Sequence, residues 1–142
     1  MFTVLTDLSL ITRRELSIDA TGTILTSGLQ GYWVSIGSNG AVAPPSATKL
    51  AWPIFNESKR DQTVGQWAPD VVKTSKVTIL AGKYFARTTV FGGSPTVNAS
   101  LDVNAIGQLV AGSTAPVAYC TVAPRNIDYL GTTVSAMDIY VF

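Results

Sequence analysis

Short apolar segments separated by turn-forming residues run along most of this chain. Val, Ile, Leu, Tyr and Phe gather in the short segments, and Gly, Pro, Asn and Ser stand between them. β-Branched and aromatic residues favour strands, whereas the separating residues favour turns. No long stretch places apolar residues at helical spacing. The pattern therefore predicts an all-β protein, an antiparallel sandwich or small barrel with about nine or ten short strands.

Four segments are the clearest strand candidates. Residues 32–36, 83–91 and 116–122 are rich in apolar residues and are bounded by glycine or proline, so we expect them to be core strands. Residues 49–55 also have strand composition, but Pro53 has no amide hydrogen to donate. We therefore expect this strand at an edge or at a bulge.

Three glycine turns predict hairpins. Asn39-Gly40 lies between two strand candidates, Ala81-Gly82 separates two more, and a third turn ends at Gly107. Tight hairpin turns need positive φ values, which glycine adopts without steric cost. We therefore expect Gly40 and Gly107 to have positive φ, and residues 77–80 to pair with the strand that follows Gly82.

The two halves of the chain contain a similar segment. Residues 40–52 align without gaps on residues 107–119, at an offset of 107 − 40 = 67 positions, with identities such as Gly40/Gly107 and Ala51/Ala118. One interpretation is that the chain contains two similar hairpin units within one domain. The alternative is that unrelated β hairpins use similar residues in similar order.

An unusually apolar segment begins the chain, where most domains carry polar residues. Phe2, Val4, Leu5 and Leu8 precede Arg13-Arg14. Residues 1–142 are expected to form a single β domain, with residues 1–15 as a possible N-terminal arm that packs on another molecule. The alternative is that this segment is the first strand of the chain's own fold.

Residues 56–70 are the most polar segment, and we expect them to form a long surface loop. Long loops in compact domains are often functional. Trp67 lies within this segment, either packed beneath the loop or offered to a partner. The candidate residues for partner binding are therefore Phe2, Val4, Leu5, Leu8 and Trp67.

Composition points to a covered surface and away from nucleic acid. Hydrophobic residues make up 46% of the 142 residues and charged residues only 13%, against about 25% in an average protein. So few charges favour a surface partly covered by a partner, including copies of itself. The net charge of +1 argues against binding along a phosphate backbone.

The sequence assembles no obvious catalytic or metal site. It has no histidine and a single cysteine, Cys120, inside an apolar run where a small buried residue is expected. Asp61, Asp70, Asp102 and Asp128 are scattered and are expected to be solvated turn acids. We therefore expect no enzymatic activity, no cofactor and no metal ion.

The N-terminal region also lacks the features of an export signal. No basic region precedes its apolar residues, and no apolar stretch is long enough to span a bilayer. We therefore expect a protein made in the cytoplasm that has no membrane partner.

The second half of the chain carries a series of strand and turn residues that together suggest a known family. They are Val77, Thr78, Leu80, Gly82, Phe85, Ala86, Thr88, Leu101, Val103, Asn104, Gly107, Leu109, Ala111, Gly112, Pro116 and Val117. At these residues the chain resembles the small capsid decoration (cement) and related head proteins of tailed bacteriophages. The resemblance covers roughly residues 75–142, and through the internal similarity it extends to residues 20–55.

This resemblance implies a structural virion protein that binds the outer capsid surface and stabilises the phage head. Its implied partners are the lattice of the major capsid protein and other copies of itself, with a trimer favoured and a dimer possible. An extended arm or strand addition would suit such binding. The alternative is a carbohydrate- or host-surface-binding β module of a phage fibre or spike, because the chain has 3 Trp and 5 Tyr. An exposed aromatic platform flanked by Asp and Asn would favour that alternative.

Overall fold

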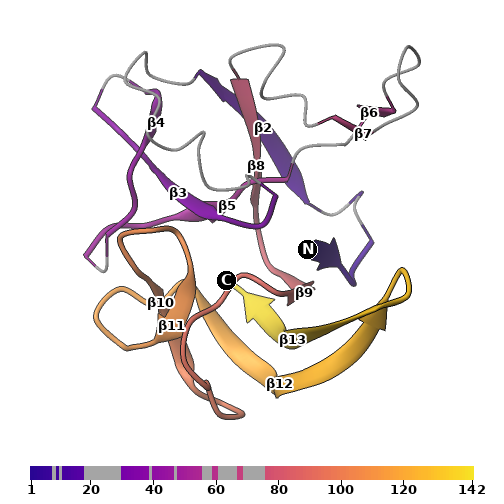
Figure 1. Ribbon diagram of the computed structural model, residues 1–142. Coiled ribbons are helices and arrows are strands. Elements are labelled where there is room, and N and C mark those ends of the chain that lie inside the picture. Colours follow the sequence, from indigo (N-terminus) through magenta and orange to yellow (C-terminus); the bar gives the residue numbers. More distant parts are fainter. Residues whose placement is uncertain are drawn as a thin grey trace.

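The computed structural model describes residues 1–7, 9, 11–17, 30–38, 40–46, 48–55, 59–60, 67–68 and 76–142. These residues form an all-β, two-layered fold (Figure 1), which confirms the predicted fold class. The strands are β1 (Phe2–Val4), β2 (Thr12–Ser17), β3 (Trp33–Ile36), β4 (Val42–Ala43), β5 (Trp52–Pro53), β6 (Lys59–Arg60), β7 (Trp67–Ala68), β8 (Lys76–Ala81), β9 (Tyr84–Thr88), β10 (Ser100–Val103), β11 (Leu109–Ala111), β12 (Ala118–Tyr129) and β13 (Thr132–Val141).

The main sheet has six strands in the order β1-β9-β13-β12-β10-β11, all paired antiparallel. Its longest part is the β12–β13 hairpin, which curves beneath the rest of the molecule in Figure 1. The pairing of this hairpin shifts register twice, between Cys120 and Val122 and between Val122 and Arg125. Pro124 lies within the second shift. Proline has no amide hydrogen to donate, and its absence is tolerated here because the regular pairing of the two strands is already interrupted.

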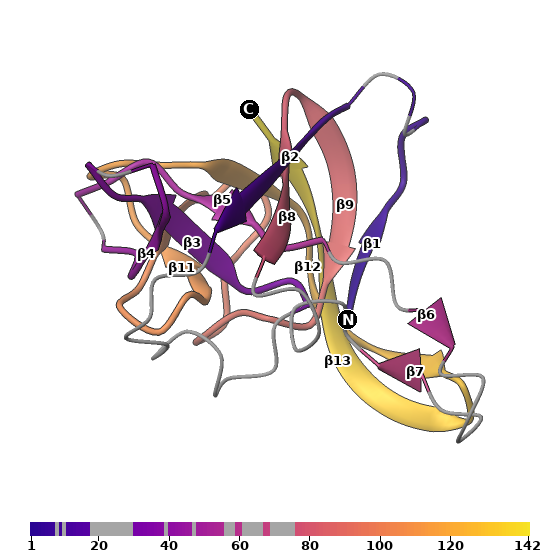
Figure 2. The same ribbon diagram turned by 90° about the horizontal axis from the view of Figure 1, so that it is seen from above.

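A second layer packs over the main sheet. It consists of the three-stranded sheet β4-β3-β5 and the pair β2-β8. An isolated bridge between Ile54 and Ile79 and a hydrogen bond of 2.8 Å from the Phe55 amide to the Thr78 carbonyl join the two parts. Figure 2 shows the same arrangement from above, with β3, β5, β8 and β2 crossing over the main sheet.

The hydrophobic core fills the space between the layers. Trp33 and Leu80 from the second layer meet Leu101 and Ile139 from the main sheet in one buried cluster. A smaller cluster lies within the second layer itself. Burying side chains of this size stabilises the fold by about 1.5–3 kcal/mol each. Burial of these apolar side chains is therefore what holds the two layers together.

The predicted core strands are present. Strands β3 and β9 fall within residues 32–36 and 83–91, and β12 begins within residues 116–122. However, β12 runs to Tyr129, well past its predicted end, because β13 pairs with it as far as Thr132. The polar residues in this part of β12 show no strand pattern, so the sequence did not predict a strand here. Pairing with β13 nevertheless holds them in one. The strand predicted at residues 49–55 is only the short β5.

The predicted hairpin at Ala81-Gly82 is wrong. Strand β8 pairs with β2, whereas β9 pairs with β1 and β13 in the other layer. Gly82 has φ = 121° and forms the corner between the layers. The other two glycine turns are confirmed, since Gly40 has φ = 77° and Gly107 has φ = 83°. The first connects the paired strands β3 and β4, and the second connects β10 and β11.

The internal similarity has a structural counterpart. The strand orders β4-β3-β5 and β11-β10-β12 are the same, with the first strand of each unit in the middle. In the first unit Ser35 pairs with Ala43, and in the second Asp102 pairs with Val110. Adding the offset of 67 to 35 and 43 gives 102 and 110, so the two hairpins share one register. The chain therefore contains two similar hairpin units, one in each layer.

Residues 2–4 form an edge strand of the chain's own main sheet. Strand β1 pairs with β9, and Phe2 is buried in the main core while Val4 packs against it. Residues 12–17 likewise pair with β8. Phe2 is therefore a core residue. Its position agrees with the alternative that this segment is a strand of the chain's own fold, and not with an arm that packs on another molecule. Leu5 is half exposed, and Leu8 lies outside the described residues.

Candidate binding surface

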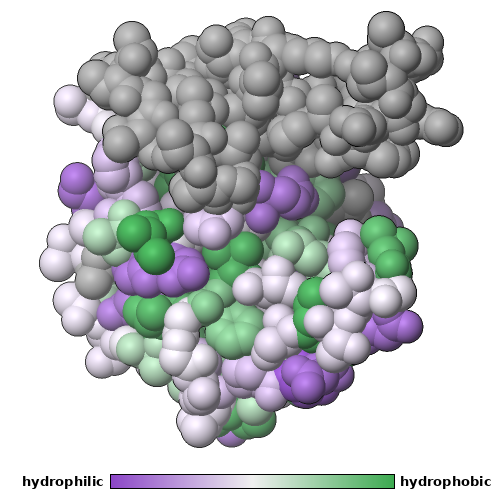
Figure 3. Space-filling view, in the orientation of Figure 1, coloured by the Kyte–Doolittle hydropathy of each residue, from purple (hydrophilic) through white to green (hydrophobic). Residues whose placement is uncertain are grey.

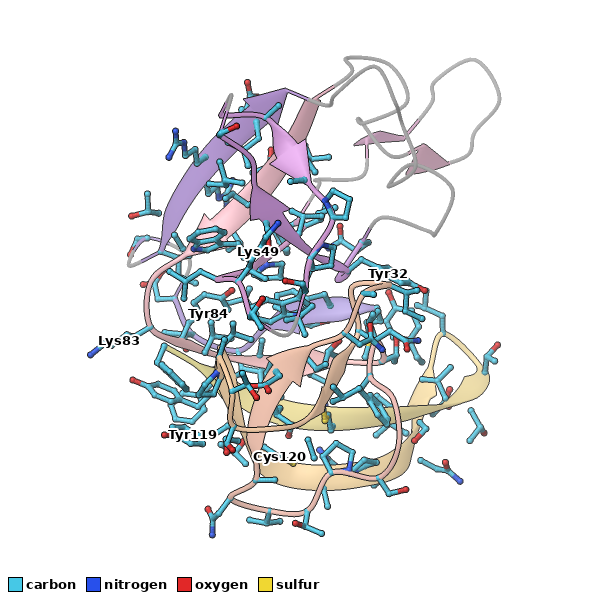
Figure 4. The ribbon with its side chains drawn as sticks, turned by 90° about the vertical axis from the view of Figure 1, so that its left-hand side faces the viewer. Tyr32, Lys49, Lys83, Tyr84, Tyr119 and Cys120 are labelled. Carbon is cyan, nitrogen blue, oxygen red and sulfur yellow. The ribbon has the colours of Figure 1, made fainter. Side chains whose placement is uncertain are left out.

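The outer face of the main sheet, which is turned away from the core, carries several exposed aromatic side chains. Side chains alternate between the two faces of a strand. On β9, Tyr84 and Ala86 point into the core, so Phe85 and Arg87 point away from it. In Figure 4 Tyr84 lies between the layers, whereas Tyr119 lies at the outer surface of the main sheet.

Four aromatic side chains form a row across this outer face. The ring centroids of Phe85 and Tyr140 are 5.0 Å apart, and those of Tyr119 and Phe142 are 4.9 Å apart and stacked. Tyr119 and Tyr140 are directly paired across β12 and β13. We call Phe85, Tyr140, Tyr119 and Phe142 the aromatic row. Phe85, Tyr119 and Phe142 remain 48%, 45% and 43% exposed, which gives a continuous apolar surface rather than scattered residues.

A hollow of about 470 Å³ opens on the aromatic row. Asn98, whose φ is 68°, borders it, and the Asn98 amide donates a hydrogen bond of 2.8 Å to the Cys120 carbonyl. Asparagine tolerates this left-handed conformation better than most residues. The hollow thus combines aromatic faces with an exposed amide side chain. Its lining residues are Phe85, Asn98, Tyr119, Cys120, Thr121 and Tyr140.

Beside the aromatic row, one carboxylate holds two arginines. Asp138 accepts hydrogen bonds from Arg87 at 2.6 and 3.0 Å and from Arg125 at 3.0 Å, so strands β9, β13 and β12 are linked by charge. The Arg87 hydrogen bonds are the main cause that lowers the pKa of Asp138, and Arg125 adds to it. The same contact raises the pKa of Arg87. This ion cluster fixes the strands that carry the aromatic row.

Cys120 is a buried core residue, as the sequence predicted. Its side chain belongs to the main core cluster. Burial is the main cause that raises the pKa of the Cys120 thiol, and the nearby charge of Asp138 adds to it. The thiol therefore stays protonated at neutral pH, and only the thiolate is a strong nucleophile.

Two of the four scattered acids bind backbone amides of separate turns. Asp102 accepts hydrogen bonds from the Thr114 and Ala115 amides at 3.0 and 3.3 Å, and Asp128 accepts one from the Gly131 amide at 3.0 Å. Asp128 is an exposed turn acid, as predicted. The prediction is wrong for Asp102, which lies in strand β10 and is buried, because the loop that follows β11 folds over its carboxylate. Asp61 and Asp70 lie outside the described residues.

No group of three His, Cys, Asp or Glu side chains that could hold a metal ion occurs among the described residues. The same part of the chain contains no helix of the length and apolar character needed to cross a bilayer. Figure 3 shows one face, on which the apolar side chains of the main-sheet half lie in separate patches among polar ones.

The candidate residues chosen from the sequence do not form one surface. Phe2 is buried, Val4 is half-buried and Leu5 is half exposed. For Trp67 the structure describes the backbone alone, which pairs with Arg60 in the β6–β7 ladder.

The sequence reasoning missed the aromatic row, although a signal was present. The terminal residues Ile139–Phe142 are all apolar, and a strand must turn alternate members of such a run away from the core. The consecutive residues Tyr84 and Phe85 carry the same signal. Consecutive large apolar residues therefore indicated strands with an apolar outer face.

No protein-family model matches this chain, and no curated protein is significantly similar to it. What the described site offers chemically is recognition. Exposed aromatic rings bind by stacking and by burial of apolar area, and the Asn98 side chain adds hydrogen-bonding groups at the border of the hollow.

Proposed function

We propose that this chain is a non-catalytic structural virion protein that binds the outer surface of a tailed-phage capsid and stabilises the phage head. The aromatic row is the observation that carries this proposal and is the proposed docking surface. Tyrosine and phenylalanine are enriched in the buried centres of protein interfaces, whereas charged residues are depleted there. The row offers such a centre, with three of its four rings about half exposed.

The rigidity of the row also supports a cementing role. Its residues stand on three paired strands, and the Arg87–Asp138–Arg125 ion cluster links the same strands. Aromatic side chains have few rotatable bonds, so they lose little entropy when a partner covers them. A rigid apolar surface therefore binds more tightly for the same buried area, because less free energy is lost in ordering its side chains.

The resemblance to decoration proteins supplies the identity of the partner in this proposal. It covers roughly residues 75–142, which contain every strand that carries the aromatic row. The proposed partners are the lattice of the major capsid protein and other copies of this chain, with a trimer favoured and a dimer possible. The proposed location is the capsid exterior.

Co-sedimentation with purified phage heads tests this proposal. The variant carries Phe85→Ser and Tyr119→Ser, which remove exposed rings while leaving the core intact. The matched control is Ile106→Ser, which removes a side chain that is 62% exposed on the β10–β11 turn. We expect the double variant to bind heads at least ten-fold more weakly than wild type, and the control to bind like wild type. Equal binding of all three proteins would exclude the aromatic row as the docking surface.

A carbohydrate-binding function is the second candidate, favoured by one observation. The hollow on the aromatic row places the exposed Asn98 side chain beside Tyr119 and Tyr140, and the Asp138 ion cluster lies on the same face. Sugars stack on aromatic rings and hydrogen-bond to amides. Glycan-array screening of wild type and the double variant tests this function. Specific glycan binding that the double variant loses, without binding to heads, would replace the capsid proposal.

A further inference from the structure

The tip of the β12–β13 hairpin combines backbone strain with an exposed apolar side chain. The turn consists of Leu130 and Gly131, with φ values of 52° and 80°. Two consecutive positive φ values are typical of a tight hairpin turn in which Asn or Gly usually stands first. Leucine is disfavoured in this conformation because its Cβ approaches the backbone. Leu130 is nevertheless present and is 89% exposed.

Neither the fold nor solubility explains a leucine at this position. Asp128 accepts a hydrogen bond of 3.0 Å from the Gly131 amide and closes the turn without help from the Leu130 side chain. Tyr129 beside it is also exposed. Strained backbone that carries an exposed functional side chain is a recognised sign of a binding role. We call residues 128–131 the hairpin tip.

The opposite end of the same hairpin contains an apolar hollow of about 190 Å³. It lies where the two layers meet, and we call it the end hollow. An apolar protein cavity of about 150 Å³ holds a molecule of benzene, so the end hollow has room for the side chain of one leucine. Its lining includes Leu50, Trp52, Leu80, Pro116, Val117 and Phe142.

The charges beside the hairpin tip and the end hollow are complementary. Lys49 and Lys83 are exposed, and each is adjacent in sequence to a residue that lines the end hollow. Figure 4 shows both lysines in the region where the two layers meet. The hairpin tip carries the exposed carboxylate of Asp128. With a net charge of +1, two copies of the chain also have little overall repulsion to overcome.

The hairpin tip cannot fill the end hollow of its own chain. Strand β12 has 12 residues and rises about 3.3 Å per residue, so its ends lie roughly 35 Å apart along the strand. Ala118 pairs with Val141 beside the end hollow, and Tyr129 pairs with Thr132 at the hairpin tip. Leu130 can therefore enter an end hollow only in another molecule.

We propose that Leu130 at the hairpin tip of one molecule inserts into the end hollow of a second copy of this chain. The two surfaces differ, so the contact is head-to-tail and closes into a ring when its rotation permits. This self-association does not depend on the capsid proposal, because both surfaces belong to the isolated chain. Of the aromatic row only Phe142 lines the end hollow, so the contact leaves Phe85, Tyr119 and Tyr140 free for another partner.

Sedimentation equilibrium of the purified protein tests the contact. Leu130→Asn removes the apolar side chain and introduces a residue that tolerates positive φ, so the variant should melt no lower than wild type. We expect wild type to associate in the micromolar range and Leu130→Asn to associate at least ten-fold more weakly. The matched control, Ile106→Asn, should associate like wild type. A monomeric wild type, or an unchanged association of Leu130→Asn, would overturn the proposal.

Cysteine cross-linking identifies the second surface. Two variants are prepared, Leu130→Cys and Leu50→Cys, and the native Cys120 is buried and should not react. After mild oxidation we expect a disulfide-linked dimer when the two variants are mixed, and almost none in either variant alone. Cross-linking of Leu130→Cys with itself, or no cross-link in the mixture, would exclude the end hollow as the site that receives Leu130. No capsid is present in either experiment, so their outcome is separate from that of capsid binding.

Discussion

Tyr84 illustrates the cost of a polar atom in the core. Its ring is buried between the layers, and its hydroxyl has no hydrogen-bond partner within the described structure. Burial raises the pKa of the Tyr84 hydroxyl. A buried hydroxyl without a partner loses the hydrogen bonds that water gave it.

Replacing Tyr84 therefore separates the ring from the hydroxyl. We expect Tyr84→Phe to leave the free energy of unfolding unchanged or to raise it by up to about 1 kcal/mol. Tyr84→Ala, in contrast, should lower it by about 3–5 kcal/mol, because it leaves a cavity. Urea denaturation measures both changes. A loss of more than about 1 kcal/mol in Tyr84→Phe would mean that the hydroxyl has a partner in the folded protein.

The lowered pKa of Asp138 predicts how the free energy of unfolding depends on pH. Its pKa is lower in the folded protein because Arg87 and Arg125 bind the carboxylate, whereas a free Asp has a pKa of about 3.9. The stability that this group contributes is therefore present above about pH 4. It is lost as the pH falls through the lower, folded pKa, because the unfolded state binds the proton more readily.

Asp138→Asn measures this contribution. At pH 7 we expect the variant to be less stable than wild type by about 1–2 kcal/mol, because two arginines lose their partner. At a pH well below 4 the difference should shrink, since acid protonates the wild-type carboxyl. Urea denaturation at both pH values gives the comparison. A difference that stays the same at both pH values would contradict the role assigned to the ion cluster.

At the scale of elements, the two glycine hairpins should respond differently to the same substitution. A Cβ at Gly40 would meet no atom within 4 Å, whereas a Cβ at Gly107 would lie 2.8 Å from the Trp33 carbonyl oxygen. Gly40→Ala should therefore cost about 1 kcal/mol from its positive φ alone. Gly107→Ala should cost clearly more, because the β10–β11 turn must move away from β3. Thermal unfolding of both variants checks the order, and equal losses would contradict the packing of the second turn against β3.

How much of each element the sequence predicted depends on how local its cause is. The positive φ of Gly40 and Gly107 follows from neighbouring residues, so the sequence predicted both turns. The corner at Gly82 depends on β2 and β1, which are distant in the chain, and the hairpin prediction failed there. The long β12 failed for a similar reason, because pairing with β13 holds polar residues that show no strand pattern.

At the scale of the whole molecule, the predicted site differs most from the observed one. The sequence placed partner binding at the N-terminal segment and Trp67, yet the described structure buries Phe2 in the main core. The aromatic row arises only when β9, β13 and β12 lie side by side, so no single segment displays it. The fold class could be predicted from local patterns, whereas this surface required the order of the strands.

We propose that the outer face of the main sheet docks on a capsid. An electron cryomicroscopy reconstruction of phage heads incubated with the purified protein would show this contact. We expect density for this chain on the outer surface of the head, with Phe85, Tyr119, Tyr140 and Phe142 buried against the capsid lattice. Bound protein whose aromatic row faces solvent, or heads without any added density, would rule out this docking surface.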